Sequence, residues 1–219
     1  MAKDYYDMPT DNTKMGDYYD QMGVELYDAM MDSVNWTEPD EIVTSVLNLQ
    51  LPKTAKVLDV GAGTGRIGSK LTKNGFNNLH ALDASDTLLG ALKAKNLYQT
   101  ANVAFLGYGN FPKEEQKENY DLVTASGVFM KGHIPCSGLD EIAGFIRPGG
   151  YFVTAMREMY FTPGEEMGFY EHIHELQDTG IFELLELRKF KRGLSDAENV
   201  SGNPLFQEMN SVLFVFRKA

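Results

Sequence analysis

The chain has 219 residues, of which 43% are hydrophobic and 23% are charged. These proportions are those of one globular domain with a sizeable core, so they exclude the disordered and fibrous classes. The formal net charge of −11 argues against a nucleic-acid partner, because such binding depends on clustered lysines and arginines. We therefore expect a small-molecule partner.

The first 50 residues predict a helical cap. Apolar residues recur at helical spacing over residues 17–34, which predicts one or two amphipathic helices. A further helix follows, with Thr37 as its N-cap and Pro39 in its first turn. We expect residues 1–50 to form a cap or lid over a core of residues 51–219.

Strand and helix patterns then alternate, which is typical of a parallel sheet with crossover helices. The predicted strands are 55–60, 78–83, 101–106, 120–126 and 151–156. The predicted helices are 66–74, 86–97, 139–146 and 165–179, and a turn is expected at 148–150. The last strand-like runs, 182–193 and 211–218, have no helix between them and predict an antiparallel hairpin at the sheet edge.

The glycine-rich stretch VLDVGAGTG, residues 57–65, follows the first predicted strand. Glycines at 61, 63 and 65 allow positive φ angles and a close approach of backbone N–H groups to a ligand. Open α/β sheets bind ligands at this end of their strands. A dinucleotide fold would need a small third residue at position 66, which is Arg66 here.

The pattern D-V-G-A-G-T-G resembles motif I of the class I S-adenosylmethionine-dependent methyltransferases. The resemblance implies a Rossmann-like α/β fold: a seven-stranded, mostly parallel sheet with an antiparallel final hairpin and helices on both faces. It also implies that S-adenosyl-L-methionine is the cofactor and S-adenosyl-L-homocysteine the product. The glycine loop would pack against the methionine part of the cofactor, and Asp59 would position its amino group. The expected contacts in this loop are Asp59, Gly61, Ala62, Gly63 and Gly65.

The second strand ends in the segment HALDAS, residues 80–85, which places Asp83 about twenty residues beyond the glycine turn. A carboxylate can accept both hydroxyl groups of a ribose, so we expect Asp83, with Ala84 and Ser85 beside it, to bind the cofactor. Because NAD also contains ribose, this contact does not distinguish the two cofactors. The alternative is that Asp83 caps the helix that follows.

The segment after the third strand, FLGYGNFP at 105–112, is expected to line the adenine pocket. In the family that the sequence resembles, an Asp often binds the adenine amino group at this point. Tyr108 stands there instead, so backbone groups of Gly109 or Asn110 are candidates to replace it. An ordinary turn at the end of the strand is the alternative.

The segment YDLVTASGVFMKGHIP, residues 120–135, resembles motif IV of the same family and its extension. That resemblance places Ser126 beside the sulfonium group. His133 is then the one histidine expected near the transferred methyl group, where it is a candidate general base. The alternative is a structural histidine in a loop.

Two basic residues are candidates for contacts with the methyl acceptor. Lys131 lies next to the histidine loop, and Arg157 leaves the fifth strand on the side of the expected pocket. An arginine there suits a carboxylate of the substrate. For Arg157 the alternative is a surface ion pair with Glu158 or Glu165.

The stretch YDQMGVELYD, residues 19–28, resembles the entry helix that caps the cofactor in several small-molecule methyltransferases. Tyr19 and Tyr27 are therefore expected at the cofactor, because a tyrosine ring attracts a sulfonium charge through its face. The alternative is that both rings belong to the core of an amphipathic helix.

Further segments, among them GHIPCS and RPGG, resemble methyltransferase-like proteins of the Williams-Beuren syndrome chromosome region. The resulting hypothesis is methyl transfer to a small-molecule acceptor. A non-catalytic cofactor-binding or regulatory protein is one alternative, and an NAD-dependent oxidoreductase, which Arg66 disfavours, is another.

The compartment and the metal content complete the expectations from sequence. A single cysteine, Cys136, cannot form an internal disulfide and is typical of a reducing compartment. The N-terminal segment is acidic and rich in tyrosine, so we expect neither a signal peptide nor a membrane partner, and a cytoplasmic location. The histidines and the cysteine lack ligand spacing, so no metal site is expected.

Overall fold

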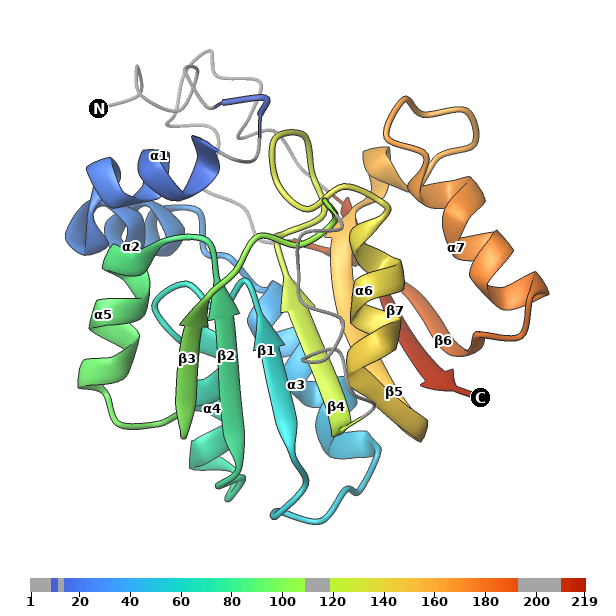
Figure 1. Cartoon of the computed structure of the whole chain (residues 1–219), viewed down its shortest axis with the longest axis horizontal. Coiled ribbons are helices and arrows are strands. Elements are labelled where there is room, and N and C mark those ends of the chain that lie inside the picture. Colours follow the sequence, from blue (N-terminus) through green and yellow to red (C-terminus); the bar gives the residue numbers. More distant parts are fainter. Residues whose placement is uncertain (1–8, 12–13, 109–118, 193–209) are drawn as a thin grey trace.

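A computed structural model describes residues 9–11, 14–108, 119–192 and 210–219 of the chain. Within these ranges seven strands form one sheet, in the order β3-β2-β1-β4-β5-β7-β6 (Figure 1). The strands are β1 Val57–Val60, β2 Leu79–Asp83, β3 Thr100–Val103, β4 Tyr120–Ser126, β5 Ile146–Arg157, β6 Phe182–Lys191 and β7 Asn210–Lys218.

The sheet is parallel from β3 to β5 and antiparallel at its other edge. Strand β7 pairs antiparallel with both β5 and β6. The strand order reverses at β1 and β4, so their carboxyl ends flank a crevice of the kind where open α/β sheets bind ligands. The predicted fold class, including the antiparallel final hairpin, is confirmed.

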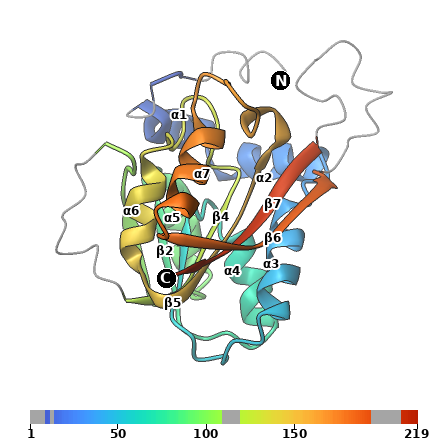
Figure 2. The same ribbon diagram turned by 90° about the vertical axis from the view of Figure 1, so that its right-hand side faces the viewer.

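Helices cover both faces of the sheet, and two of them cover its upper edge. The helices are α1 Met15–Met22, α2 Val24–Ser33, α3 Glu38–Asn48, α4 Arg66–Lys73, α5 Asp86–Ala94, α6 Gly138–Phe145 and α7 Phe169–Asp178, with a short 3₁₀ helix η3 at Glu158–Tyr160. Helices α6 and α7 lie on one face and α3 and α4 on the other (Figure 2). Helices α1 and α2 lie over the carboxyl ends of the strands (Figure 1). None of the helices in the described ranges is both long and apolar enough to cross a membrane.

Two apolar layers hold the sheet between its helices. Phe129, Phe152 and Phe169 belong to the layer under α6 and α7. On the opposite face, Ile42 of α3 and Val153 of β5 belong to the second layer. Because successive residues of a strand point to opposite faces, β5 supplies both layers. Helix α3 is therefore a layer of the sandwich, while α1 and α2 cover the ligand edge.

The N-terminal helices agree with the sequence pattern, with two differences in detail. The pattern over 17–34 forms two helices that are separated at Gly23, where φ is +74°. Thr37 occupies the N-cap position of α3, but its hydroxyl makes no capping bond. It donates instead to the carbonyl of Lys191 at 3.0 Å, because the end of β6 lies beside the start of α3.

The start of the fifth strand was predicted wrongly. Strand β5 begins at Ile146, five residues before the expected start, and includes the expected turn at 148–150. Its register with β4 shifts between Tyr120 and Leu122, and Gly149 has a φ of +75°. Such a bulge tolerates a proline, which cannot donate a ladder hydrogen bond. The residues Pro148, Gly149 and Gly150 are typical of a turn, so the sequence pattern wrongly predicted that the strand begins only after them.

Candidate functional site

The main cavity lies over the carboxyl ends of the central strands, beneath α1 and α2. The space between its walls is about 880 Å³, a figure that includes the open solvent at its mouth. Of the residues proposed from sequence, those that line it include Tyr19, Tyr27, Gly61, Gly63, Asp83 and Ser126. Ala84 and His133 also line it.

The glycine turn forms the floor of the cavity. Gly61, Gly63 and Gly65 have φ angles of +65°, +54° and +86°, a region that side chains rarely adopt. A Cβ on Gly61 would lie 2.1 Å from Cγ1 of Val128, and one on Gly63 would lie 3.0 Å from the hydroxyl of Tyr27. The turn therefore has no room for larger residues at these two positions.

Asp83 is held by the backbone of this turn. Its Oδ2 accepts the N–H of Gly63 at 2.7 Å, and its Oδ1 accepts the N–H of Ser85 at 2.9 Å. Burial raises the pKa of the carboxyl, although these hydrogen bonds act in the opposite direction. Each oxygen keeps a further lone pair for a hydroxyl of a ligand. Ser85, and not Asp83, caps the following helix α5, because the hydroxyl of Ser85 accepts the N–H of Leu88 at 3.1 Å.

Asp59 lies below the floor of the main cavity. It accepts the hydroxyl groups of Tyr98 at 2.7 Å and Thr124 at 2.9 Å. It borders a small adjoining cavity together with Ala62. Burial raises the pKa of Asp59 to about 6, and the charge of Asp83 adds to the effect.

The two buried acids make this end of the site electronegative. Within the described part of the chain, neither Asp59 nor Asp83 forms an ion pair with a lysine or an arginine. Buried carboxylates are costly unless a cation or hydrogen-bond donors compensate them. Hydrogen-bond donors already compensate both carboxylates in part, and a ligand that carries positive charge and hydroxyl groups would add to this compensation.

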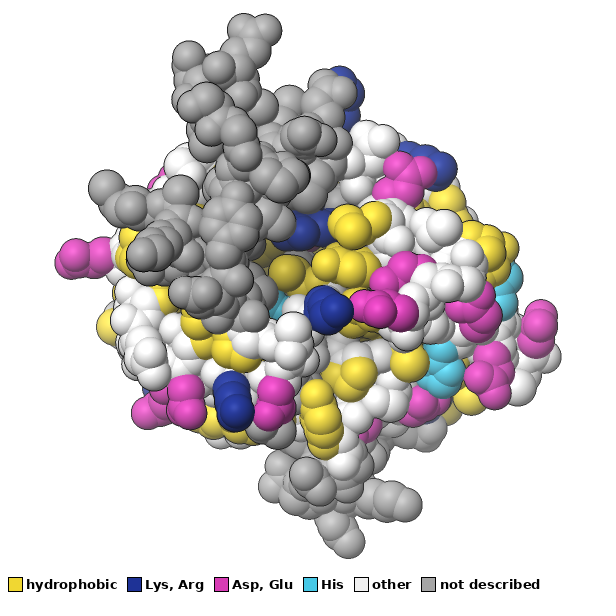
Figure 3. Space-filling view, turned by 90° about the horizontal axis from the view of Figure 1, so that it is seen from above, with side chains coloured by type: hydrophobic (Ala, Val, Ile, Leu, Met, Phe, Trp, Pro, Cys, Tyr) yellow, Lys and Arg dark blue, Asp and Glu magenta, His cyan; other side chains and the backbone are white. Residues whose placement is uncertain are grey.

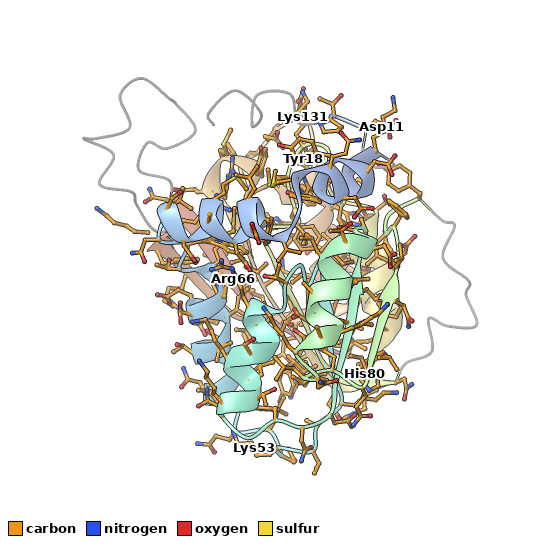
Figure 4. The ribbon with its side chains drawn as sticks, turned by 90° about the vertical axis from the view of Figure 1, so that its left-hand side faces the viewer. Asp11, Tyr18, Lys53, Arg66, His80 and Lys131 are labelled. Atoms are coloured by element: carbon orange, nitrogen blue, oxygen red, sulfur yellow. The ribbon has the colours of Figure 1, made fainter. Side chains whose placement is uncertain are left out.

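Helices α1 and α2 are tied to the cavity by acidic side chains. Asp20 of α1 accepts the hydroxyl of Ser85 and, at 3.0 Å, the N–H of Thr87. Asp28 of α2 accepts the hydroxyl of Thr64 at 2.8 Å and pairs with Arg66 at 3.0 Å. Figure 4 shows Arg66 below α2. The residue that breaks the dinucleotide pattern thus helps to hold the cap.

We expect Asp20→Ala to loosen α1 at a cost of about 1–2 kcal/mol, the usual effect of losing a capping acceptor. Amide hydrogen exchange of residues 15–22 would increase, while the sheet stays protected. Asp17→Ala is the matched control, because Asp17 is exposed on the same helix. Equal exchange in the two variants would contradict this role of Asp20.

His133 lies in the cavity wall as a neutral hydrogen-bond acceptor. Its Nδ1 lies 3.3 Å from the carbonyl of Lys131, which can only accept, so this nitrogen carries the hydrogen. Its Nε2 lies 2.8 Å from the hydroxyl of Tyr19 and accepts from it. Burial, together with the charges of Arg157 and Arg192, lowers the pKa of His133 to about 4.

This lowered pKa predicts a loss of stability in acid. The folded chain binds the proton with a pKa of about 4 and the unfolded chain with one near 6.5. As the pH falls from 6.5 to 4, the unfolded state takes up a proton that the folded state does not, which costs about 2–3 kcal/mol. Asp59, whose pKa is raised to about 6, contributes with the opposite sign between pH 6 and 4.

Comparison of variants separates these two opposing effects. His133→Gln should lose less stability than the wild type between pH 6.5 and 4.5 in urea unfolding. His172→Gln is the control, because His172 lies on α7 between Asp140 and Glu175 and does not line the cavity. Parallel pH curves for His133→Gln and the wild type would refute the burial of a neutral imidazole.

A polar cluster at the far end of the cavity was missed by sequence reasoning. Glu38 is 1% exposed, and its Oε1 accepts from Nε of Arg192 and from the hydroxyl of Ser211, both at 2.8 Å. Its Oε2 lies 3.3 Å from the hydroxyl of Ser126, which donates to it. The guanidinium of Arg192, which lines the cavity, lies 5.9 Å from the ring of Trp36. No sequence motif contains the four members of this cluster, which are Glu38, Ser126, Arg192 and Ser211.

The remaining predicted site residues lie elsewhere. Tyr108 is 43% exposed and does not line the cavity, whose wall on that side is formed by residues 104–106. Gly109 and Asn110 lie outside the described residues. Lys131 is on the surface and pairs with Glu166 at 3.0 Å. Among the described residues, Arg157 forms an ion pair with neither Glu158 nor Glu165, the two partners considered from the sequence.

Comparisons with known proteins agree with this geometry. Residues 51–186 match the family model described as a methyltransferase domain. Over 106 residues the chain is 34% identical to Methyltransferase-like protein 27 of Homo sapiens, a match that covers 48% of this chain and 42% of that protein. The chain therefore spans less than half the length of this relative.

Solved structures show the same fold at low sequence identity. The [4+2]-cyclase SpnF has a TM-score of 0.65 at 13% identity, with 95% of this chain and 97% of the cyclase covered. An S-adenosylmethionine-dependent methyltransferase from Mesorhizobium loti has a TM-score of 0.54 at 17% identity, with 81% and 98% covered. Because one neighbour is named a cyclase, the fold by itself does not name the reaction.

The site also fits the cofactor that the family uses. S-adenosylmethionine carries an ammonium group, a sulfonium group and a ribose, which suit the carboxylate of Asp83 in the cavity wall, the glycine turn, and the buried carboxylate of Asp59 beneath that turn. The family match covers more than half of the chain. The chain belongs to the methyltransferase-domain family.

Proposed function

We propose that the enzyme methylates a small molecule that binds in the main cavity beside the cofactor. The observation that carries the proposal is the continuity of this cavity from Asp83 and Gly63 to Trp36, His133 and Arg192, beneath α1 and α2. A covered cavity suits an acceptor that can be enclosed. The net charge of −11 adds to the case against a nucleic-acid acceptor.

The cofactor end of the cavity is assigned as follows. Asp83 would accept the ribose hydroxyls, and the backbone of the glycine turn would approach the methionine part. The rings of Tyr19 and Tyr27, whose centroids are 5.7 Å apart, would lie against the sulfonium. Four further residues would support the walls of the cofactor end without lining the cavity, namely Asp59, Ala62, Gly65 and Ser85. The segment with Tyr108, Gly109 and Asn110 is still predicted to lie beside the adenine ring of the cofactor.

The bound cofactor supplies an electrophilic methyl group on its sulfonium. The chain has to hold the attacking atom in line with that methyl group and to exclude water, and positioning of this kind supplies most of the rate in such reactions. His133, with a pKa of about 4, is a weak base. We assign it a hydrogen-bonding role that orients Tyr19 or the acceptor, rather than removal of a proton.

The narrower resemblance to the Williams-Beuren group is also a proposal. The shared segment GHIPCS occupies residues 132–137 and contributes His133 and Ile134 to the cavity wall. Ser137 donates to the carbonyl of Gly107 at 2.6 Å, so this segment is fixed against the loop after β3. A shared acceptor wall would explain why these residues are alike. A cap at residues 1–50 and a cytoplasmic location remain predictions.

Two measurements test the proposed function. Calorimetric titration with S-adenosylmethionine, S-adenosylhomocysteine and NAD should give micromolar binding for the first two alone. The protein is then incubated with methyl-labelled cofactor and a cell extract separated into protein, RNA and small-molecule fractions. Label in the small-molecule fraction supports the proposal, and label in protein or RNA contradicts it. Binding without label in any fraction favours the regulatory alternative.

A further inference from the structure

Arg157 is a buried cation that has no partner among the described residues. The side chain is 7% exposed, and its Nε has no hydrogen-bond acceptor among the described residues. It forms no ion pair within the same ranges. Arginine is almost never buried without a compensating group, because the loss of hydration costs several kcal/mol. The position therefore suits an anion that is not part of the described chain.

Arg157 does not itself line the cavity, but the sheet register places it next to the polar cluster at the far end, and its charge acts on His133 in the cavity wall. Arg157 ends β5 and pairs directly with Ser211 of β7, so both side chains lie on the same face of the sheet. Ser211 reaches Glu38, as does Ser126 at the end of β4. The glycine turn, in contrast, follows β1, which is two strands away.

The carboxylates around Arg157 are already engaged. Glu158 pairs with Lys189, and Glu165 accepts the N–H of Met167 at 2.9 Å. Glu38 is bonded to Arg192 and to the two serines. Among the described residues, this end of the cavity holds Glu38 against Arg157, Arg192 and a neutral His133, so the charge of these residues sums to a positive value. In the view from above, Figure 3 shows Lys or Arg side chains among apolar ones near the middle, with Asp or Glu side chains beside them.

A second unpartnered donor lies at the same end. The indole Nε1 of Trp36 is buried and has no acceptor among the described residues, and the ring lines the main cavity. A Cβ on Gly127, the residue after β4, would lie 2.9 Å from Cζ2 of this ring. Trp36 and Arg157 thus both offer N–H groups and no acceptors.

We propose that the methyl acceptor carries a carboxylate, which the guanidinium of Arg157 and the indole N–H of Trp36 bind. This inference rests on the proposed function, because it specifies the acceptor of the same cavity. A carboxylate accepts two parallel N–H bonds from a guanidinium and can accept a further bond from the indole. The methionine part of the cofactor also carries a carboxylate, and the test must distinguish the two sources.

The single tryptophan of the chain provides a specific probe. The indole N–H resonance of Trp36 is followed by NMR in the full-length protein saturated with S-adenosylhomocysteine. A panel of straight-chain and aromatic carboxylic acids is titrated, each beside its neutral amide. At least one acid should shift the resonance saturably with a dissociation constant at least 10-fold lower than its amide. Arg157→Met should remove this difference, and Arg188→Met should keep it.

The control and the opposing outcomes are defined by the structure. Arg188 pairs with Glu41 and Glu186 at the sheet edge, outside the cavity. If no acid exceeds its amide, or if the difference persists in Arg157→Met, the proposal is wrong. If Arg157→Met weakens S-adenosylhomocysteine at least 10-fold but leaves 5′-methylthioadenosine unchanged, the carboxylate belongs to the cofactor, and the proposal is also wrong.

Thermal unfolding gives a readout that needs no ligand. Arg157→Met removes a buried unpaired cation and should raise Tm by about 2–4 °C, whereas a cation with a structural role would lower it on removal. A lower Tm would contradict the proposal. Failure of the proposed function is distinguishable, because it would appear in the wild type as absent cofactor binding or as label in protein or RNA.

Discussion

Asp83→Asn is expected to weaken S-adenosylmethionine binding by about 100-fold or more, because two charge-assisted hydrogen bonds to the ribose would be lost or inverted. The carboxylate also fixes the glycine turn through the N–H of Gly63. An amide group has one acceptor atom, so it cannot satisfy this N–H, the N–H of Ser85 and two hydroxyls together. Calorimetric titration of the purified variant measures the change.

Stability distinguishes this effect from a general loss of structure. Burial raises the pKa of Asp83, which means that the charged form is disfavoured in the fold. A neutral amide avoids this cost but leaves one N–H of the turn less well satisfied, so Tm should change little while affinity falls. Asp86→Asn is the control, because Asp86 is exposed in the first turn of the helix that follows. Wild-type affinity in Asp83→Asn would remove Asp83 from the cofactor site.

Glu38→Ala is expected to lower the free energy of unfolding by about 3–5 kcal/mol, the usual cost of removing one partner from a buried ion pair. The variant leaves Arg192 without its carboxylate and removes the acceptor of the Ser126 and Ser211 hydroxyls. These groups hold the ends of β4, β6 and β7 against α3. Urea unfolding measures the loss, and affinity for the cofactor should fall with it because Ser126 lines the cavity.

A second glutamate on the same helix provides the control. Glu41 pairs with Arg188 at 2.9 Å, but both side chains are about one-third exposed. Exposed pairs contribute about 0–1 kcal/mol, so Glu41→Ala should be nearly neutral. Glu38→Gln keeps the size and one acceptor and should fall between the two variants. A loss below 1 kcal/mol for Glu38→Ala would show that the buried cluster does not stabilise the fold.

Local patterns in the sequence were enough for the fold and for the glycine turn and Asp83 that border one end of the cavity. Strand β1 and the glycine turn are adjacent in the chain, and backbone geometry requires glycine wherever φ is positive, as at Gly61 and Gly63. Asp83 follows twenty residues later, at the end of the neighbouring parallel strand. Periodicity likewise indicated the parallel strands and the final hairpin. It failed at 148–150, where a bulge lies inside β5 and the local signal is that of a turn.

The end of the cavity that we propose for the acceptor was decided by tertiary structure. Glu38 meets Ser126, Arg192 and Ser211 across 88, 154 and 173 residues of the chain, so no local spacing relates them. The sequence suggested Arg157 as a carboxylate ligand or as a surface ion pair, and the two readings have the same residue pattern. Only the packing of β5 against β7 shows that this guanidinium is buried while its acidic neighbours are engaged elsewhere. Charge compensation depends on distances in space, which periodicity does not encode.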